Sequence, residues 1–164
     1  MGFTFAVAAL FAVAGCSGDD DSATGSGERG SAATTAEGFG DAVGSVNIIN
    51  TEVGPVIGDD AGFTLYAFDG DSQGTSDCVA ADCIRIWPPA LTSDPVTGEG
   101  VEGGLVGGID RDEGRQLTYA GRPLYRFSGD NRAGEIKGCG TAGRWWPVAA
   151  DGSRRTSCAA TIDG

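Results

Sequence analysis

Residues 62–71 read GFTLYAFDGD, and residues 121–130 read GRPLYRFSGD. Six of the ten positions are identical, and the two stretches lie 59 residues apart. Moving on by the same distance from Trp87 leads to Trp146, so that a Trp-Pro pair begins 21 positions after the Tyr in both copies. The chain therefore contains an internal repeat, which predicts that one structural unit is built twice.

The sequence around both copies follows β-strand patterns. The stretch VNIINTEV (46–53) is rich in β-branched residues, and turn residues separate two apolar runs in 54–68 and again in 115–127. Each of these last two ranges predicts a hairpin, and no segment shows a sustained helical period with caps. We therefore predict an all-β fold, in which two repeats of about 59 residues form one compact domain with pseudo-twofold symmetry.

Alternation along a strand places the Tyr and the Phe of each copy on one face. These aromatic residues are Tyr66, Phe68, Tyr125 and Phe127. We expect all four to pack into the same core. The residues between them, Ala67 and Arg126, differ between the copies, and we expect both to face solvent. The predicted repeats cover about 54–91 and about 113–150, within a β domain at 46–164.

The N-terminal segment has the pattern of an export signal. Residues 3–15 are continuously apolar or small, which is shorter than the stretch of about 20 residues that spans a bilayer and has the length of a signal-peptide core. The stretch VAGC (13–16) resembles the lipobox of bacterial lipoproteins, in which the Cys is acylated and the preceding peptide is removed. This resemblance implies a signal peptide at 1–15 and a palmitate-type lipid on Cys16. The alternatives are an ordinary secretory signal and an apolar N-terminal helix.

The segment that follows the Cys is rich in Gly, Ser, Ala, Thr and acidic residues. Such a composition buries too little apolar surface to offset the entropy of ordering the chain. We therefore expect residues 16–45 to be the lipidated Cys and a flexible acidic tether, which holds the β domain away from the membrane.

The repeated motif has a family resemblance. Residues 66–71 and 125–130 both fit the pattern Y-x-(F/W/Y)-x-x-D. Further segments of the same kind are WPP at 87–89, LTYAGRPLY at 117–125 and WWP at 145–147. In these features the chain resembles the bacterial lipoproteins that are named for this motif and are also described as a secreted repeat of unknown function. The resemblance implies a lipid-anchored protein on the extracytoplasmic face of the cell membrane, and it implies no particular reaction.

The motif residues are interpreted as structural. They are Tyr66, Phe68, Asp71, Tyr125, Phe127 and Asp130. The Gly before each Asp can end a strand, and each Asp can accept hydrogen bonds from backbone amides of the following turn. One alternative is a calcium loop that begins at Asp69, but its twelfth position is Ala80 rather than an acid. Another alternative is that Asp71 and Asp130 are paired ligands or acids in one site.

Four further cysteines fit an exported protein. They are Cys78, Cys83, Cys139 and Cys158. An even number in an exported module suggests two disulfides, of which three pairings are possible. We favour Cys78–Cys83, a local clip, and Cys139–Cys158, which ties back the C-terminal segment. The alternative is a metal site made of all four thiolates.

Composition narrows the classes of function. The 164-residue chain has a formal net charge of −12 and contains no His. A strongly acidic chain is repelled by nucleic acid, so we expect no nucleic-acid partner. Without His, no Ser-His-Asp or Cys-His arrangement exists, and the commonest metal ligand is missing. We expect no catalytic residue, no metal and no other cofactor. The predicted function is a non-enzymatic module that binds a protein or polymer of the cell envelope; the alternative is an enzyme or a redox or metal-dependent protein with an unrecognised site.

Overall fold

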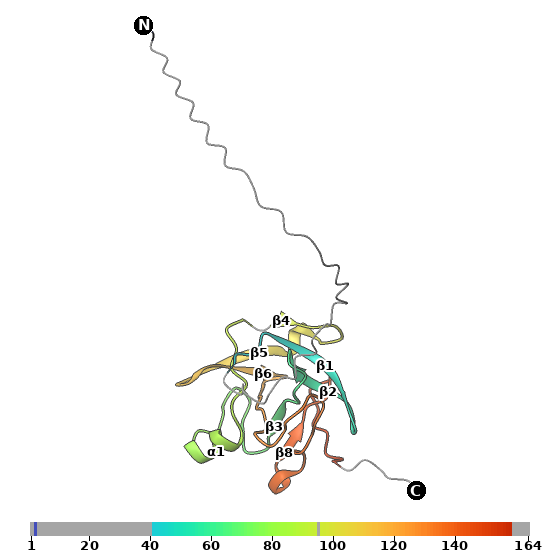
Figure 1. Cartoon of the computed structure of the whole chain (residues 1–164). Helices are drawn as coiled ribbons and strands as arrows, with labels where there is room; N and C mark the ends of the chain where they lie inside the picture. The colour runs from blue at the N-terminus through green and yellow to red at the C-terminus, as the bar shows by residue number, and fades with distance from the viewer. Residues whose placement is uncertain (1, 3–40, 95, 159–164) are drawn as a thin grey trace, which may run out of the picture. The chain divides into compact units, whose positions relative to one another are not determined.

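A computed structural model of the chain describes residues 2, 41–94 and 96–158 (Figure 1). The predicted signal peptide beyond Gly2, Cys16 and the tether before Asp41 lie outside the described residues. No helix in the described ranges is long and apolar enough to cross a membrane.

Strands make up most of the regular structure, as the sequence predicts. The strands are β1 (Ser45–Thr51), β2 (Gly54–Asp59), β3 (Tyr66–Phe68), β4 (Val96–Thr97), β5 (Val106–Arg111), β6 (Gly114–Tyr119), β7 (Arg122–Pro123) and β8 (Trp145–Pro147). The helical elements are α1 (Ala81–Ile86) and two short 3-10 helices, η1 (Gly103–Leu105) and η2 (Thr141–Gly143). Helix α1 has only six residues, which is too short to produce a helical period in the sequence.

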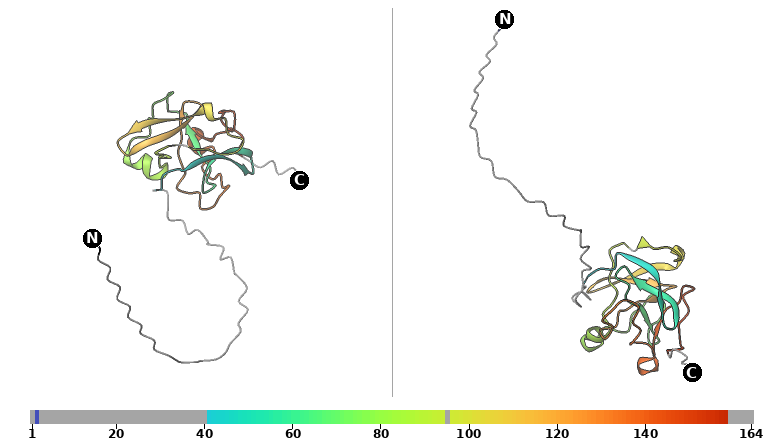
Figure 2. Two further views of the ribbon diagram at one scale, coloured as in Figure 1. Left: turned by 90° about the horizontal axis from the view of Figure 1, so that it is seen from above. Right: turned by 45° about the vertical axis from the view of Figure 1, so that its right-hand side comes forward.

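The strands form three small sheets. One has the order β2-β1-β4, with β1 antiparallel to β2 and parallel to β4. A second has the order β5-β6-β7 and is antiparallel throughout, and a third pairs β3 with β8. The hairpin of β1 and β2 and the hairpin of β5 and β6 extend in different directions from the domain (Figure 2).

The two repeats meet at their motif tyrosines. The backbone amide of Tyr66 donates to the carbonyl of Tyr125 at 2.9 Å, and the amide of Tyr125 donates to the carbonyl of Tyr66 at 2.9 Å. Such a reciprocal pair is what a twofold axis between two antiparallel segments produces. The all-β fold with two symmetric repeats is therefore as predicted.

Each loop after the motif contacts the turn of the other repeat. The amide of Gly74 donates to the carbonyl of Gly121, and the amide of Gly134 donates to the carbonyl of Gly62, both at 2.9 Å. Gly62 and Gly121 have φ angles of 83° and 75°, which favour glycine at both turns. These two hydrogen bonds connect the repeats on both sides of the pseudo-twofold axis.

After the motif, the structural correspondence between the repeats is shifted by one residue from the sequence offset of 59. Pro147 pairs with Tyr66, while Pro89 forms a bridge with Tyr125. The structural equivalent of Trp87 is therefore Trp145, and the alignment of Trp87 with Trp146 is wrong. The sequence hides this shift because WPP and WWP both place a Trp before a Pro.

The expectation that Ala67 and Arg126 face solvent is also wrong. Ala67 is 1% exposed and Arg126 is 4% exposed. The Nε of Arg126 donates to the Oδ2 of buried Asp59 at 2.7 Å, and its Nη1 donates to the carbonyl of Asp41. Burial of the guanidinium is possible because a carboxylate and a carbonyl compensate its desolvation.

Candidate functional site

The motif tyrosines and aspartates form two crossed pairs. The hydroxyl of Tyr66 donates to Asp130 Oδ2 at 2.7 Å, and the hydroxyl of Tyr125 donates to Asp71 Oδ2 at 2.8 Å. Each tyrosine therefore bonds the aspartate of the other repeat. Both tyrosines are fully buried. Sequence analysis did not predict this exchange.

The second oxygen of each aspartate holds the loop that follows the motif. Asp71 Oδ1 accepts from the amide of Asp77 at 2.8 Å, and Asp130 Oδ1 accepts from the amide of Lys137 at 2.9 Å. Both bonds are of the kind expected from the sequence. Each aspartate thus joins a loop of its own repeat to a tyrosine of the other repeat.

The glycine of the motif is required by the aromatic ring two residues before it. A Cβ added at Gly70 would collide with the ring of Phe68, and a Cβ added at Gly129 would collide with the ring of Phe127. Each ring therefore lies against the following turn. This contact explains why the motif combines an aromatic residue, a glycine and an acid in this order.

Burial shifts the ionisation of the crossed pairs. It raises the pKa of Asp130 to about 6, although the Tyr66 hydroxyl and the Lys137 amide act in the opposite direction. Burial also raises the pKa of Asp71. The pKa values of both tyrosines are raised, by burial first and also by the neighbouring aspartate charges. At neutral pH the phenols therefore keep their protons and act as donors.

A stack of two tryptophans lies between the crossed pairs. The ring centroids of Trp87 and Trp145 are 3.8 Å apart and the ring planes are 1° from parallel. Each of the two residues is 4% exposed. Tyr66 packs edge-to-face with Trp87, with 5.4 Å between ring centroids, and Tyr125 packs edge-to-face with Trp145, with 5.1 Å between ring centroids. The motif phenylalanines cover the outer faces of the stack.

Phe68 stacks on Trp145 at 4.3 Å, and Phe127 packs on Trp87 at 4.5 Å. All four motif aromatics therefore belong to one cluster, which also contains Cys78. The structure contains the disulfides Cys78–Cys83 and Cys139–Cys158, which are the pairs that the sequence favoured.

The carboxylates of the calcium-loop alternative face donors instead of each other. Asp69 accepts from the indole N–H of Trp146 at 2.9 Å and pairs with Arg154. Asp71 accepts from Tyr125 and from a backbone amide. Within the described part of the chain, no three His, Cys, Asp or Glu side chains lie close enough together to hold a metal ion.

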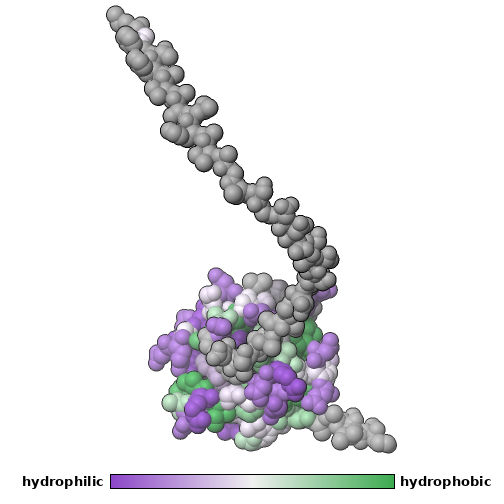
Figure 3. Space-filling model, in the orientation of Figure 1, coloured by the Kyte–Doolittle hydropathy of each residue, from purple (hydrophilic) through white to green (hydrophobic). Residues whose placement is uncertain are grey.

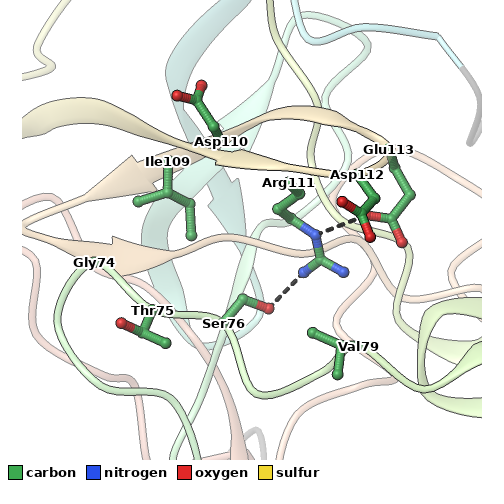
Figure 4. Close-up of a pocket in the computed structure, with 9 residues that line it drawn as sticks. All are labelled: Gly74, Thr75, Ser76, Val79, Ile109, Asp110, Arg111, Asp112 and Glu113. Atoms are coloured by element: carbon green, nitrogen blue, oxygen red, sulfur yellow. Dashed lines mark hydrogen bonds and ion pairs between the residues drawn. The ribbon is translucent and has the colours of Figure 1, made fainter.

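A hollow is lined by side chains from two separate segments of the chain (Figure 4). Its volume is about 320 Å³, and its walls come from the loop after the first motif and from the tip of the β5–β6 hairpin. It is lined by Gly74, Thr75, Ser76, Val79, Ile109, Asp110, Arg111, Asp112 and Glu113. No pattern in the sequence indicates this hollow, because its two walls are distant in the chain.

Arg111 is the central side chain of the hollow, and its side chain is 5% exposed. Its guanidinium donates to Ser76, Gln116, Glu113 and the carbonyl of Cys78. The hydroxyl of Ser76 in turn shares a hydrogen bond of 2.7 Å with that of Tyr125. The hollow is therefore connected to the Tyr125–Asp71 pair through Ser76.

The hollow lies between the two repeats, since its lining residues at 74–79 belong to the first repeat and those at 109–113 to the second. Its arginine has no counterpart at the equivalent position of the first repeat. Arg111 pairs with Gly114 at the end of its hairpin, and Thr51 pairs with Gly54 at the same place in the β1–β2 hairpin. The position of the arginine is thus occupied by a threonine in the first repeat. Arg111 and its partners are an addition to the symmetric framework.

Comparison with known families agrees with the repeated architecture. A family model described as a secreted repeat of unknown function matches residues 47–91 and 107–149, together more than half of the chain. The chain belongs to this secreted-repeat family. No curated protein and no solved structure matches the chain. Both matched segments include most of the first strand of their repeat, β1 or β5, while the repeats expected from the sequence begin at about 54 and about 113.

Proposed function

We propose that this secreted-repeat protein is a lipid-anchored, non-enzymatic binding module on the extracytoplasmic face of a bacterial cell membrane. Cys16 is its lipidation site, and residues 16–45 are its tether. The VAGC sequence before the tether and the secreted character of the family support this placement. A lipid at Cys16 holds the module at the membrane, and the tether lets it reach a protein or polymer of the envelope.

One observation carries the non-enzymatic part of the proposal. Every polar side-chain atom of the motif tyrosines and aspartates is used inside the fold: each carboxylate oxygen accepts a hydrogen bond, and each phenol donates to the other repeat. Asp130 is 1% exposed, and both phenols are buried. Burial therefore keeps a reacting substrate away from Asp130 and from both phenols. The motif therefore stabilises the fold, and contact with partners takes place elsewhere on the protein.

The hollow beside Arg111 is the binding site we propose for such a partner. Arg111 is held rigidly by four acceptors, so the walls of the hollow are organised before a partner arrives. Val79 lines the hollow and is 65% exposed, so its apolar side chain is available for contact. The face in Figure 3 is mostly hydrophilic, with apolar areas at the lower left, where α1 lies in the same orientation. An apolar side chain within a polar rim is typical of a contact surface.

Capture of partners from solubilised membranes tests the proposal, with the lipidated protein as bait. We expect a specific partner, and we expect Val79→Asp to abolish its capture. Ile86→Asp is the matched control, because Ile86 is 38% exposed on nearby α1 and does not line the hollow. Equal capture by both variants would contradict the assignment of the hollow.

Anchoring is tested separately with Cys16→Ala. We expect this variant in the medium or as unprocessed precursor, because the lipid is its only strong attachment to the membrane. A processed Cys16→Ala protein that stays with the membrane would contradict the lipid anchor.

A further inference from the structure

The aromatic cluster places four oxidisable side chains in one chain of contacts. Trp87 and Trp145 are stacked at 3.8 Å, Tyr66 touches one of them and Tyr125 touches the other. Tryptophan and tyrosine are among the side chains that lose a single electron most readily. Contact distances of this kind permit an electron to move from ring to ring without solvent or a bound cofactor.

Each tyrosine also has a partner for its proton. A tyrosine that loses an electron becomes a strong acid and gives up its phenolic proton, so its oxidation is easy only where a base accepts that proton. Asp130 Oδ2 lies 2.7 Å from the Tyr66 oxygen, and Asp71 Oδ2 lies 2.8 Å from the Tyr125 oxygen. Both carboxylates are thus within the reach required of a general base.

We propose that this core is a proton-coupled relay for single oxidising equivalents. A one-electron oxidant of the envelope, such as an oxidising radical, takes an electron from the Trp87–Trp145 stack and is itself reduced. The resulting tryptophan radical cation takes an electron from Tyr66 or Tyr125 and returns to neutral tryptophan. The phenolic proton passes to Asp130 or Asp71 in the same step, which leaves a neutral tyrosyl radical and a protonated carboxyl group.

Burial supports this assignment in two ways. It seals the stack and both phenols from water, which protects a radical from side reactions and leaves electron transfer possible, because electrons need no open path to the surface. Burial also raises the pKa of Asp130 to about 6, which makes the carboxylate a stronger base than an ordinary aspartate while it remains largely ionised at neutral pH.

The relay has two arms, one ending in Tyr66 and Asp130 and the other in Tyr125 and Asp71. The surroundings of the two arms differ. The Tyr66 oxygen accepts from the amide of Gly138 at 3.3 Å and stays inside the core. The Tyr125 hydroxyl shares a hydrogen bond with Ser76, which lines the surface hollow. The two arms therefore have to be measured one at a time.

Pulse radiolysis of the full-length protein with azide radical as the oxidant tests the relay. We expect the tryptophanyl absorption to decay while a tyrosyl absorption rises, at a rate that is independent of protein concentration. Tyr119 is the only other tyrosine in the chain, and its hydroxyl donates to the carbonyl of Ala150 instead of a carboxylate. Tyr119→Phe should leave the transfer unchanged, and the double variant Tyr66→Phe/Tyr125→Phe should abolish it.

The role of the aspartates as proton acceptors is tested in variants that retain only one of the two tyrosines. Each variant is used only if its melting temperature lies above the temperature of the experiment. In Tyr125→Phe only the Tyr66 arm remains, and adding Asp130→Asn should slow its transfer on the order of 100-fold, at the lower end of what a positioned base contributes. The same arm should slow in Tyr125→Phe alone as the pH falls through about 6, because Asp130 takes up a proton there.

The titratable groups that face Asp130 are Tyr66 from β3 and Glu135 and Lys137 from its own loop, and the pKa values of Tyr66 and Glu135 lie far from this pH range.

A tryptophanyl radical that never converts to tyrosyl in the wild-type protein would overturn the relay. Conversion that is equally fast with and without Asp130→Asn, at every pH, would overturn the role of the carboxylates. Either result leaves the proposed binding function untouched, because that function depends on the hollow.

Discussion

Replacing Tyr66 by Phe isolates one bond of the crossed pairs. The change removes a hydroxyl and keeps the ring, so contacts of the ring with Trp87 and Phe127 remain. Asp130 then loses one of its two hydrogen-bond donors at a buried position. A hydrogen bond to a charged group contributes about 1.5–3 kcal/mol, so we expect the free energy of unfolding to fall by about 2 kcal/mol. For a domain of this size the melting temperature should drop by about 6–12 °C.

Tyr119→Phe is the matched control for this prediction. Tyr119 is equally buried, but its hydroxyl donates at 2.6 Å to a neutral carbonyl, that of Ala150. Its loss should cost about 1 kcal/mol. The excess cost of Tyr66→Phe should also shrink below a pH of about 6, because Asp130 then becomes protonated and no longer places a bare charge opposite the phenylalanine. Urea unfolding followed by circular dichroism at several pH values measures both quantities. Equal costs for the two variants at every pH would refute the reasoning.

Further predictions concern the buried charges and the disulfides. Arg126→Ala should cost about 3–5 kcal/mol in urea unfolding, because it leaves the buried carboxylate of Asp59 unpaired; a cost below 1 kcal/mol would contradict the ion pair. Replacing both Cys139 and Cys158 by Ser should cost about 3 kcal/mol, and peptide mapping without reductant should find these two residues linked. The pKa of Asp130 is raised in the folded state, so its contribution to stability is complete below a pH of about 4 and is lost as the pH rises through about 6. Asp130→Asn should remove that decline, and an unchanged pH profile would count against it.

Local patterns in the sequence were sufficient for much of the fold. The repeat, the alternation of aromatic residues and the turn glycines predicted an all-β domain with a shared aromatic core. The capping role of Asp71 and Asp130 was also predictable, because it involves amides only six and seven residues away. The sequence left three cysteine pairings possible and favoured the local clip between Cys78 and Cys83, and the structure contains this clip.

Contacts between the repeats were not predictable in the same way. The bond between Tyr66 and Asp130 joins residues that are 64 positions apart, and nothing in either motif copy indicates that the partners are exchanged. Arg126 was misjudged for a related reason: its partner, Asp59, lies 67 positions away and has no counterpart in the motif. A single sequence contains no signal for such pairs.

The hollow illustrates a second kind of limit. Arg111 stands in a hairpin where the first repeat has Thr51, and only the comparison of the two structural repeats reveals the arginine as an addition. A framework can thus be predicted from what two repeats have in common, while a candidate site depends on where they differ.

The central claim is that the repeated motif holds the two repeats together and does not contact the membrane partner. The most direct test is to measure melting and partner capture together in Asp71→Asn and Asp130→Asn. We expect a lower melting temperature for each variant, with no restoration by added metal ions or small molecules, and normal capture at temperatures where the variant is folded. Variants that melt like the wild-type protein and yet lose the partner would contradict the claim.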